Sequence, residues 1–502
     1  MSSTESVQPG VYGNIIKPGR QGILGLSMGV SLAGVPFILL IVFMLIQRQY
    51  ILALIFAVAG VVGALLMVAT KRQGRDIYQR AALRTAQKVK ERSGNHLAIN
   101  GPAGRAPDGK YRLPGLLTPS ELSEHTDSYG NPFGLIRLEA ARHYTIVFEA
   151  YPDGDALVDK SRIDAQISHW GSWLAQLGIE DGIIGASVTV ETAPDSGLRL
   201  ERMVTQNVSP EASDFATAVA GSITKELNGE SPQFTTRLSI TFSGRGVDKE
   251  GSDRGLTTMA DEIGNRIPVL LSGLYETGAG TSVRACTAQD IVDFTRSAYD
   301  PTVANLIEQA RAEGGTGLTW QDAGPSFASD QVDLYFHDRA VSKSWQMFEG
   351  PRGMFYSNSL KRALEPTKGL LRKRVTLLYR PIPADKTTGV AEADINNATF
   401  AGSQKQRISA RQKQRLAYAV QTAKEEAQGA GLVRFGMIIT VTCDRSSEFP
   451  RLDKIIPALG NPAKLRLRPA LANQAVTFQA GLPLGVVLPL HMAISDNTRN
   501  WI

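Results

Sequence analysis

Three groups of residues in this chain have types and spacing that could support chemistry. The first is the segment GRAPDGKY at 104–111, which matches the first seven positions of a phosphate-binding loop. Such a loop needs Ser or Thr after its lysine, and then a helix whose backbone amides face the phosphates. Tyr111 stands at the hydroxyl position, and Pro114 disfavours a helix directly after it. We therefore expect a surface turn here rather than a nucleotide site.

The second group consists of acids and histidines. Glu191 and Asp195 in the segment ETAPDSG, and the adjacent pair His337 and Asp338, combine side chains that exchange protons in general acid–base catalysis. Acids in turns are ordinary, however. The six histidines show no metal-binding spacing, and no G-x-S-x-G motif is present. The sequence has no specific catalytic signature, so we expect no cofactor, no metal and no enzymatic activity.

The third group is cationic. The tract SQKQRISARQKQR at 403–415 contains five cations and no acid, a composition that suits the phosphates of nucleic acid or lipid. We favour the simpler interpretation, which is the solvated start of a helix. The residues that would contact an anionic partner are Lys405, Arg407, Arg411, Lys413 and Arg415.

These residues belong to a chain of 502 residues, of which 43% are hydrophobic and 20% charged. That composition is typical of a folded protein with two or three domains. The net charge of +6 is too small for this length to indicate a nucleic-acid-binding protein. Cys286 and Cys443 have no CxxC or metal-binding spacing, which predicts free thiols in a reducing compartment.

A long apolar segment lies near the start of the chain. Residues 22–70 are interrupted only by the polar cluster Gln47-Arg48-Gln49. The cluster leaves two stretches, 22–46 and 50–70, and each has the length of about 20 residues that a membrane span needs. One uninterrupted helix would be roughly 73 Å long, more than twice the thickness of the hydrocarbon core. We therefore predict a two-helix transmembrane hairpin with Arg48 at its tip.

Positive charge flanks this hairpin on both sides. Lys17 and Arg20 precede it, and the strongly basic run 71–93 follows it. The positive-inside rule then places the hairpin in the plasma membrane with both termini in the cytoplasm. The basic run fits either a helix on the anionic inner leaflet or a stop-transfer anchor, and both remain open. The residues expected to anchor the chain at the membrane are Lys71, Arg72, Arg75, Arg80 and Arg84.

The rest of the chain predicts a mixed α/β (α+β) cytoplasmic region. After the tail 1–21, the hairpin and the basic helix 71–93, the segment 94–132 is rich in Gly and Pro and predicts a linker. The region 133–502 alternates strand and helix patterns, with two subdomains dividing near 300–330 as one option. Strands are expected at 133–150 (a hairpin), 182–192, 234–243, 375–379, 432–443 and 464–468, and helices at 161–178, 211–228, 256–276 and 406–429. Trp170 and Trp173 are expected in the core.

Longer stretches of the chain resemble an actinobacterial family of conjugation-type membrane proteins over nearly its whole length. They are YGNIIKPGRQGILGLS, LPGLL, HWGSWLAQLG, ASVTVETAPDSG, GGTGLTWQDAGP, RKRVTLLYRP, EEAQGAGLVRFG and QAGLPLGVVLP. The arrangement resembles a two-helix inner-membrane subunit of type IV secretion fused to the non-motor, amino-terminal domain of the assembly ATPase.

The resemblance implies a role without implying an active site. In the assembly ATPases a segment similar to GLPLG at 481–485 leads into the motor domain, whereas 17 residues follow it here. The implied function is an oligomeric scaffold for DNA transfer whose partners are a separate motor ATPase, other membrane subunits and anionic lipid, with indirect contact to nucleic acid. A type VII secretion membrane component and a membrane-attached enzyme of unknown chemistry are the alternatives.

Overall fold

The computed structural model describes most of the chain, and the statements below refer to that part. The described residues are 11–13, 28–69, 73–75, 77–104, 111–152, 154, 158–195, 197–209, 211–227, 232–246, 251–280, 282–351, 353–403, 410–444 and 446–492.

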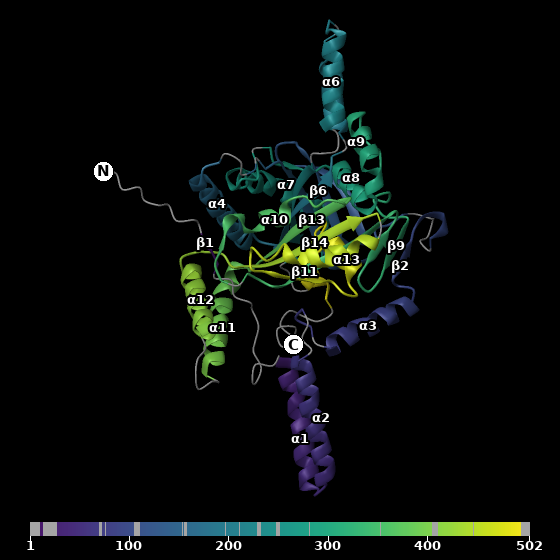
Figure 1. Cartoon of the computed structure of the whole chain (residues 1–502). Coiled ribbons are helices and arrows are strands. Elements are labelled where there is room, and N and C mark those ends of the chain that lie inside the picture. Colours follow the sequence, from purple (N-terminus) through teal and green to yellow (C-terminus); the bar gives the residue numbers. More distant parts are fainter. Residues whose placement is uncertain are drawn as a thin grey trace, which may run out of the picture.

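A 13-stranded antiparallel sheet dominates the structure (Figure 1), in the order β2-β9-β10-β11-β14-β13-β6-β7-β5-β4-β3, with β15 paired to β11 and β8 to β5. A separate two-stranded sheet pairs β1 (Val11–Tyr12) with β12 (Phe355–Tyr356). The strands of the large sheet are β2 (Leu97–Ile99), β3 (Ser120–Thr126), β4 (Pro132–Leu138), β5 (His143–Ala150), β6 (Ile183–Pro194), β7 (Pro232–Ser243), β8 (Arg284–Ala285), β9 (Phe327–Asp330), β10 (Tyr335–His337), β11 (Ala340–Glu349), β13 (Arg372–Pro381), β14 (Val433–Cys443) and β15 (Arg466–Pro469).

The predicted mixed α/β class is confirmed, and one continuous sheet connects the two halves of the chain. The junction is the antiparallel pair β6–β13, in which Val190 lies opposite Val375. The sequence left open a division into two subdomains near residues 300–330. Strands on both sides of this region belong to a single sheet.

Two strands lie within 94–132, the segment predicted to be a linker. The short edge strand β2 pairs with β9, and β3 pairs with β4 through seven opposed residues. The high Gly and Pro content hides these strands from a pattern search, and the partner of β2, the strand β9, comes from a distant part of the chain. The linker prediction is wrong for these residues.

The two faces of the sheet have different chemistry. On β5, Tyr144, Ile146 and Phe148 pack with α4 (Lys160–Ile179) and α7 (Leu256–Ser272) in one apolar cluster. Val147, which lies between Ile146 and Phe148 on the same strand, belongs instead to a cluster with α8 (Ala288–Tyr299) and residues 478–486. Since successive strand side chains point to opposite faces, the sheet is covered on both sides. The helix α13 (Phe449–Ala458) extends the first face over β11, β13 and β14.

Three groups of helices project from the sheet domain in Figure 1. The pairs α1–α2 and α11–α12 leave on the same side, while α6 stands on the opposite side. The predicted helix 406–429 corresponds to α12, and its neighbour α11 was not predicted. The remaining helices are α1 (Met28–Ile46), α2 (Tyr50–Ala69), α3 (Ile77–Arg92), α5 (Leu198–Asn207), α6 (Asp214–Leu227), α9 (Ala304–Ala312), α10 (Lys361–Leu364), α11 (Ala384–Ser403), α12 (Ala410–Ala427) and α14 (Gln474–Ala480).

The predicted hairpin is present as the helices α1 and α2, and residues 22–27 of its first predicted stretch lie outside the described residues. The turn between them includes Arg48, which adopts a left-handed conformation with φ of 58°. Within the residues described, no helix is both long and apolar enough to cross a membrane. The structure therefore does not support the transmembrane part of this prediction.

Candidate functional site

Glu191 lies in the interior of the sheet and is unsuited to proton transfer. Its carboxylate pairs with the guanidinium groups of Arg372 and Arg374, and Arg374 is only 2% exposed. Burial raises the pKa of Glu191, but the positive charges of Arg372, Arg374 and Arg237 outweigh it and hold that pKa at about 2. A carboxylate that stays ionised at neutral pH and is saturated by arginines connects strands rather than shuttling protons. The second acid of this motif, Asp195, follows β6 directly and shows no contact to Glu191 within the described residues.

The pair His337 and Asp338 is also structural. His337 is fully buried, with Nδ1 2.5 Å from the Tyr299 carbonyl and Nε2 2.7 Å from the Ser342 hydroxyl. Burial lowers the pKa of His337 to about 4, so the ring is neutral near pH 7. Asp338 accepts the backbone N–H of Ser326 at 2.7 Å. Each side chain is therefore occupied by its surroundings.

A row of buried hydroxyls crosses the sheet on the face that carries Glu191. Cross-strand neighbours on adjacent strands contact each other directly, as expected for opposed residues. The pairs are Thr145–Thr241 at 3.1 Å, Ser187–Ser239 at 2.7 Å, Thr189–Thr376 at 3.1 Å, Ser344–Thr440 at 2.9 Å and Ser342–Thr442 at 2.7 Å. No pattern in the sequence predicted this row, because its members alternate with apolar residues on different strands.

The GLPLG segment lies directly on this hydroxyl row. The Thr376 hydroxyl donates to the Gly481 carbonyl at 2.7 Å, and the Gln474 side chain accepts the Ser344 N–H at 2.7 Å. Leu482 and Leu484 are each 2% exposed. The segment 474–486 is thus packed against the sheet as part of the folded domain.

The helix α3 is attached to the domain by polar contacts that the sequence did not predict. The Gln87 side chain is 1% exposed and donates to the Asp330 carbonyl at 2.8 Å. The Lys90 ammonium pairs with the Asp330 carboxylate. The same carboxylate accepts the backbone N–H of Ala475 at 3.1 Å, at the start of α14. Asp330 therefore connects the helix that follows the hairpin with the helix that leads into GLPLG.

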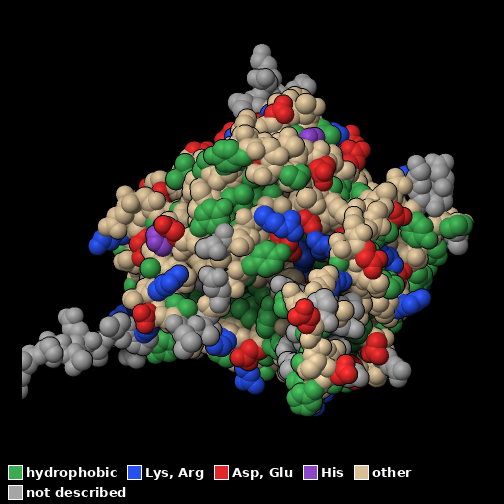
Figure 2. Space-filling model, turned by 90° about the horizontal axis from the view of Figure 1, so that it is seen from above, with side chains coloured by type: hydrophobic (Ala, Val, Ile, Leu, Met, Phe, Trp, Pro, Cys, Tyr) green, Lys and Arg blue, Asp and Glu red, His purple; other side chains and the backbone are tan. Residues whose placement is uncertain are grey.

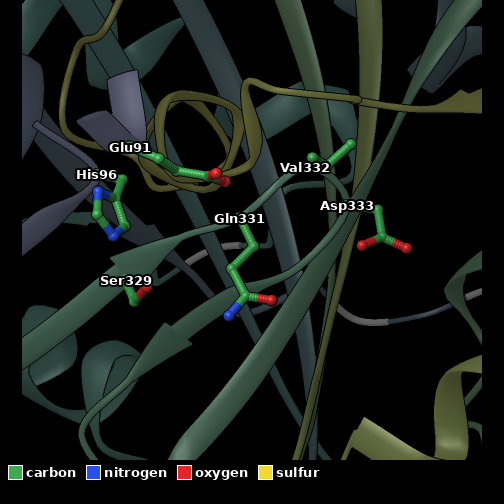
Figure 3. A pocket seen from close by; sticks show the side chains of 6 residues that line it. All are labelled: Glu91, His96, Ser329, Gln331, Val332 and Asp333. Atoms are coloured by element: carbon green, nitrogen blue, oxygen red, sulfur yellow. The ribbon is translucent and has the colours of Figure 1, made fainter. Parts of the chain in front are cut away.

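A polar pocket of about 400 Å³ lies next to this junction. Figure 3 shows Gln331 between His96 on one side and Asp333 on the other, and Glu91 of α3 also reaches the pocket. Ser329 and Val332 complete the lining. In the part of the chain that is described, no group of three or more His, Cys, Asp or Glu could hold a metal ion.

Of the five cations predicted to anchor the chain at the membrane, Arg75 has a different role. It is only 9% exposed and donates to the Pro469 carbonyl at 3.0 Å, so it holds the chain against β15. Burial, together with the charge of Arg468, lowers its pKa to about 10. A guanidinium in this position is not available to lipid headgroups. The physical reason is the close packing of residues 73–75 on β15, which only the tertiary structure creates.

The other predicted anchors divide into three groups. Lys71 and Arg72 lie outside the described residues. Arg80 is partly buried and Arg84 is exposed, and the exposed Lys88 and Arg92 continue from Arg84 at intervals of four residues. Residues spaced in this way share one face of a helix. The outward face of α3 therefore carries the row Arg84, Lys88 and Arg92, of which only Arg84 was among the predicted anchors.

The predicted anionic contacts at 403–415 are only partly visible. Lys405 and Arg407 lie outside the described residues, and α12 includes Arg411 without a description of its side chain. Lys413 is exposed, and Arg415 is partly buried. In the GRAPDGKY segment, 105–110 also fall outside the description.

Two further predictions are confirmed. Trp173 is 4% exposed, donates to the Leu270 carbonyl at 3.2 Å and stacks on Trp170 at 5.0 Å, as expected of core residues rather than a base-stacking surface. Cys286 and Cys443 are free and buried.

Asp330→Asn is expected to loosen α3 and α14 together. The amide retains the size of the side chain but cannot pair with the Lys90 charge, and losing a charged hydrogen bond costs about 1.5–3 kcal/mol. Hydrogen–deuterium exchange should become faster in 77–92 and in 474–480, with β6 and β7 unchanged. Asp333→Asn is the matched control, since Asp333 lines the same pocket with its side chain 51% exposed. Faster exchange in only one of the two helices would contradict the proposed connection.

Comparison of the chain with protein-family models and with curated proteins found no match. Function must therefore be inferred from the residues and their arrangement.

Proposed function

We propose that this protein is a non-enzymatic inner-membrane scaffold of a type IV-like conjugative secretion system, and that it anchors and organises a separate motor ATPase. The observation that carries the proposal is the apolar hairpin, followed along the chain by α3, which is attached to the sheet domain through Asp330. Large apolar side chains point outward along α1 and α2, including Ile38 at 60%, Ile46 at 73% and Ile51 at 77% exposure. Exposing an apolar surface of this kind to water is unfavourable, whereas contact with the hydrocarbon core of a membrane is favourable.

The cationic row on α3 supports an inner-leaflet location for the domain. Arg84, Lys88 and Arg92 are exposed on α3, and within the described residues none of the three forms an ion pair. Cations next to an anionic leaflet contribute about 1 kcal/mol each to membrane binding. With this leaflet on the cytoplasmic side, the sheet domain and both termini are cytoplasmic.

The contacts of Asp330 support the link to a motor ATPase. One carboxylate contacts both α3, which follows the hairpin, and α14, which leads into GLPLG. In the assembly ATPases that this chain resembles, a segment similar to GLPLG leads into the motor. A motor on a separate chain would then dock on the sheet domain near GLPLG. In this domain Asp330 holds both α3 and α14.

Purification from native membranes tests this function. The tagged full chain, extracted in mild detergent, is expected to co-purify with a motor ATPase, and the purified chain alone is expected not to hydrolyse ATP. A variant with Arg84, Lys88 and Arg92 changed to Gln should reach the membrane less efficiently, while Glu91→Gln on the same helix serves as the control. Repeated recovery of the membrane-bound chain without any motor would refute the scaffold role. ATP hydrolysis by the chain alone that is lost in Lys110→Ala would show it to be an enzyme.

A further inference from the structure

The strand β2 is one edge of the large sheet and lacks the residues that usually protect an edge. Among the described strands it pairs with β9 alone, at the right of the sheet in Figure 1. Edge strands are commonly protected by charged side chains or proline. The strand at the other edge, β3, carries the exposed acids Glu121 and Glu124. The residues of β2 are Leu97, Ala98 and Ile99, with neither a charge nor a proline.

One face of this edge exposes apolar side chains. Leu97, Ile99 and Phe327 are 42%, 43% and 42% exposed, and Ile99 lies directly opposite Phe327 in the β2–β9 pair. Figure 2 shows a different character on the face seen from the α6 side, where acidic, basic and apolar side chains are interspersed. The β2 edge thus presents an apolar strip beside which a further strand could lie.

The polar pocket described above continues this strip. Phe327 and Ser329 are alternate residues of β9 and point to the same face, and Ser329 lines the pocket. Glu91 and Asp333 bring two carboxylates to it (Figure 3). Glu91 is exposed, and Asp333, which is 51% exposed, contacts the Lys343 ammonium at 3.4 Å. A segment that covers the strip therefore meets negative charge at one end of it.

The backbone of β2 has hydrogen-bonding groups on its outer side. The His96 carbonyl and the Asn100 N–H bond to the β9 side. Alternate residues of an antiparallel strand bond to the partner, so the backbone groups of Leu97 and Ile99 point away from β9. The Leu97 N–H donates to the Gly94 carbonyl at 3.2 Å. The outer side of β2 is left with the Leu97 carbonyl and both groups of Ile99.

One of these three groups is obstructed, which decides the direction of an added strand. Gly104 lies so near the Ile99 carbonyl that a Cβ there would be 2.5 Å from its oxygen. The accessible groups are then the Leu97 carbonyl and the Ile99 N–H. In a parallel pair, one residue of the added strand bonds to two residues that are two positions apart. In an antiparallel pair it exchanges both bonds with a single residue. The accessible groups of β2 match a parallel strand.

A second copy of this chain does not fit the same edge. Two copies related by a two-fold axis make a self-complementary contact, and strands joined across such an axis run antiparallel. That pairing would need both backbone groups of Leu97 or both of Ile99. The strand β2 also contains no cation that could meet the carboxylates of the pocket.

We propose that the β2 edge binds an extended segment of another protein as a parallel strand, with two apolar residues at alternate positions and a Lys or Arg two positions before them. The apolar side chains lie beside Leu97 and Ile99, and the residue between them bonds to β2. The cation passes over Asn95 towards Glu91 and Asp333. Main-chain bonds supply affinity and side chains supply sequence preference when a strand adds to a sheet edge. This interaction goes beyond the scaffold role and requires neither the membrane nor a motor.

The experiment measures the binding of fluorescein-labelled peptides to the purified full chain in mild detergent by fluorescence anisotropy. The peptide TKTVTVT has the proposed order, and TVTVTKT has the same composition reversed. We expect the first to bind about five-fold more tightly, the upper effect of an exposed ion pair. An antiparallel strand would instead favour the reversed peptide, because its cation would then lie at the pocket.

Two variants test the contacts separately. Ile99→Pro removes the outward N–H, which an edge strand tolerates, and should weaken binding about ten-fold through the lost hydrogen bond. Ile99→Val keeps the N–H and should bind within about two-fold of the original chain. Glu91→Gln should weaken the binding of TKTVTVT about three-fold and leave that of the neutral peptide TQTVTVT unchanged. Urea unfolding checks that each variant is folded.

Several results would overturn the proposal. They are equal affinity for the forward and reversed peptides, tighter binding of the reversed one, binding that Ile99→Pro leaves intact, and no binding at millimolar peptide. A dimer in detergent that Ile99→Pro dissociates would assign the edge to a second copy instead. None of these results bears on the membrane scaffold, whose test is recovery of the motor from membranes.

Discussion

Glu191→Ala is expected to destabilise the protein by about 3–5 kcal/mol, the usual cost of removing one partner from a buried ion pair. The substitution leaves the Arg374 guanidinium, only 2% exposed, without its carboxylate. Arg372 loses the same partner. Urea unfolding of the full chain in mild detergent, monitored by tryptophan fluorescence, measures the change in the free energy of unfolding.

The matched control is Glu448→Ala, which breaks an ion pair with Arg451 in which the side chains are 40% and 49% exposed. Surface pairs of this kind contribute about 0–1 kcal/mol. If the two substitutions have the same small effect, the Glu191 pairs are not the buried connection described above.

The pH dependence of the free energy of unfolding follows from the lowered pKa values of two buried groups, Glu191 and His337. The pKa of Glu191 is about 2 in the folded protein, below its ordinary value of 4.5. A carboxyl with a lowered folded pKa stabilises the fold above its unfolded pKa, and this contribution is lost as the pH falls from 4.5 towards 2. His337, with a folded pKa of about 4, makes the protein lose stability already below about pH 6.5, because the unfolded state gains the proton first. Glu191→Ala should flatten the curve only in the lower range.

Gly485→Ala is expected to destabilise the protein by about 2–5 kcal/mol, through backbone strain and overpacking together. Gly485 has a φ of +76°, and a Cβ at this position would lie 1.9 Å from the Thr145 hydroxyl oxygen. Thr145 cannot move aside easily, since it is 2% exposed and contacts Thr241. The same unfolding experiment measures the loss.

Two other glycines separate the causes. Gly429 has a φ of +95° with no atom within 4 Å of an added Cβ, so Gly429→Ala should show backbone strain alone, about 1–2 kcal/mol. Gly389 lies inside α11 with open space around it, and Gly389→Ala should stabilise the protein by about 0.5–1 kcal/mol. A loss for Gly485→Ala no greater than for Gly429→Ala would show that GLPLG does not lie against Thr145.

The elements that the sequence predicted well are those with a strong local period. The helix at 161–178 and the strand at 234–243 appear as α4 and β7, with boundaries that differ by at most two residues. The missed elements have weak periods. The helix α11 contains Gly, Thr and Asn at many positions, and its packing against α12 stabilises it. The strand β2 has three residues and exists because β9 lies beside it.

The candidate sites show the same division. Glu191 was recognised as notable, but the arginines that keep it ionised lie 181 and 183 residues further along the chain. Gln87 and Asp330, which join α3 to the domain, are 243 residues apart. No spacing rule connects residues at such distances, so the sequence revealed neither the role of Asp330 nor the arginine partners of Glu191.

The sequence alone establishes the apolar hairpin segment, the basic run after it and the mixed α/β class, because these features depend on residues that are neighbours along the chain. Only the tertiary structure decides that Arg75 is buried while Arg84 faces outward, that Glu191 is held as a carboxylate, and that GLPLG lies on the hydroxyl row. The reason is physical: burial, charge pairing and close approach are set by groups that folding brings together from distant parts of the chain.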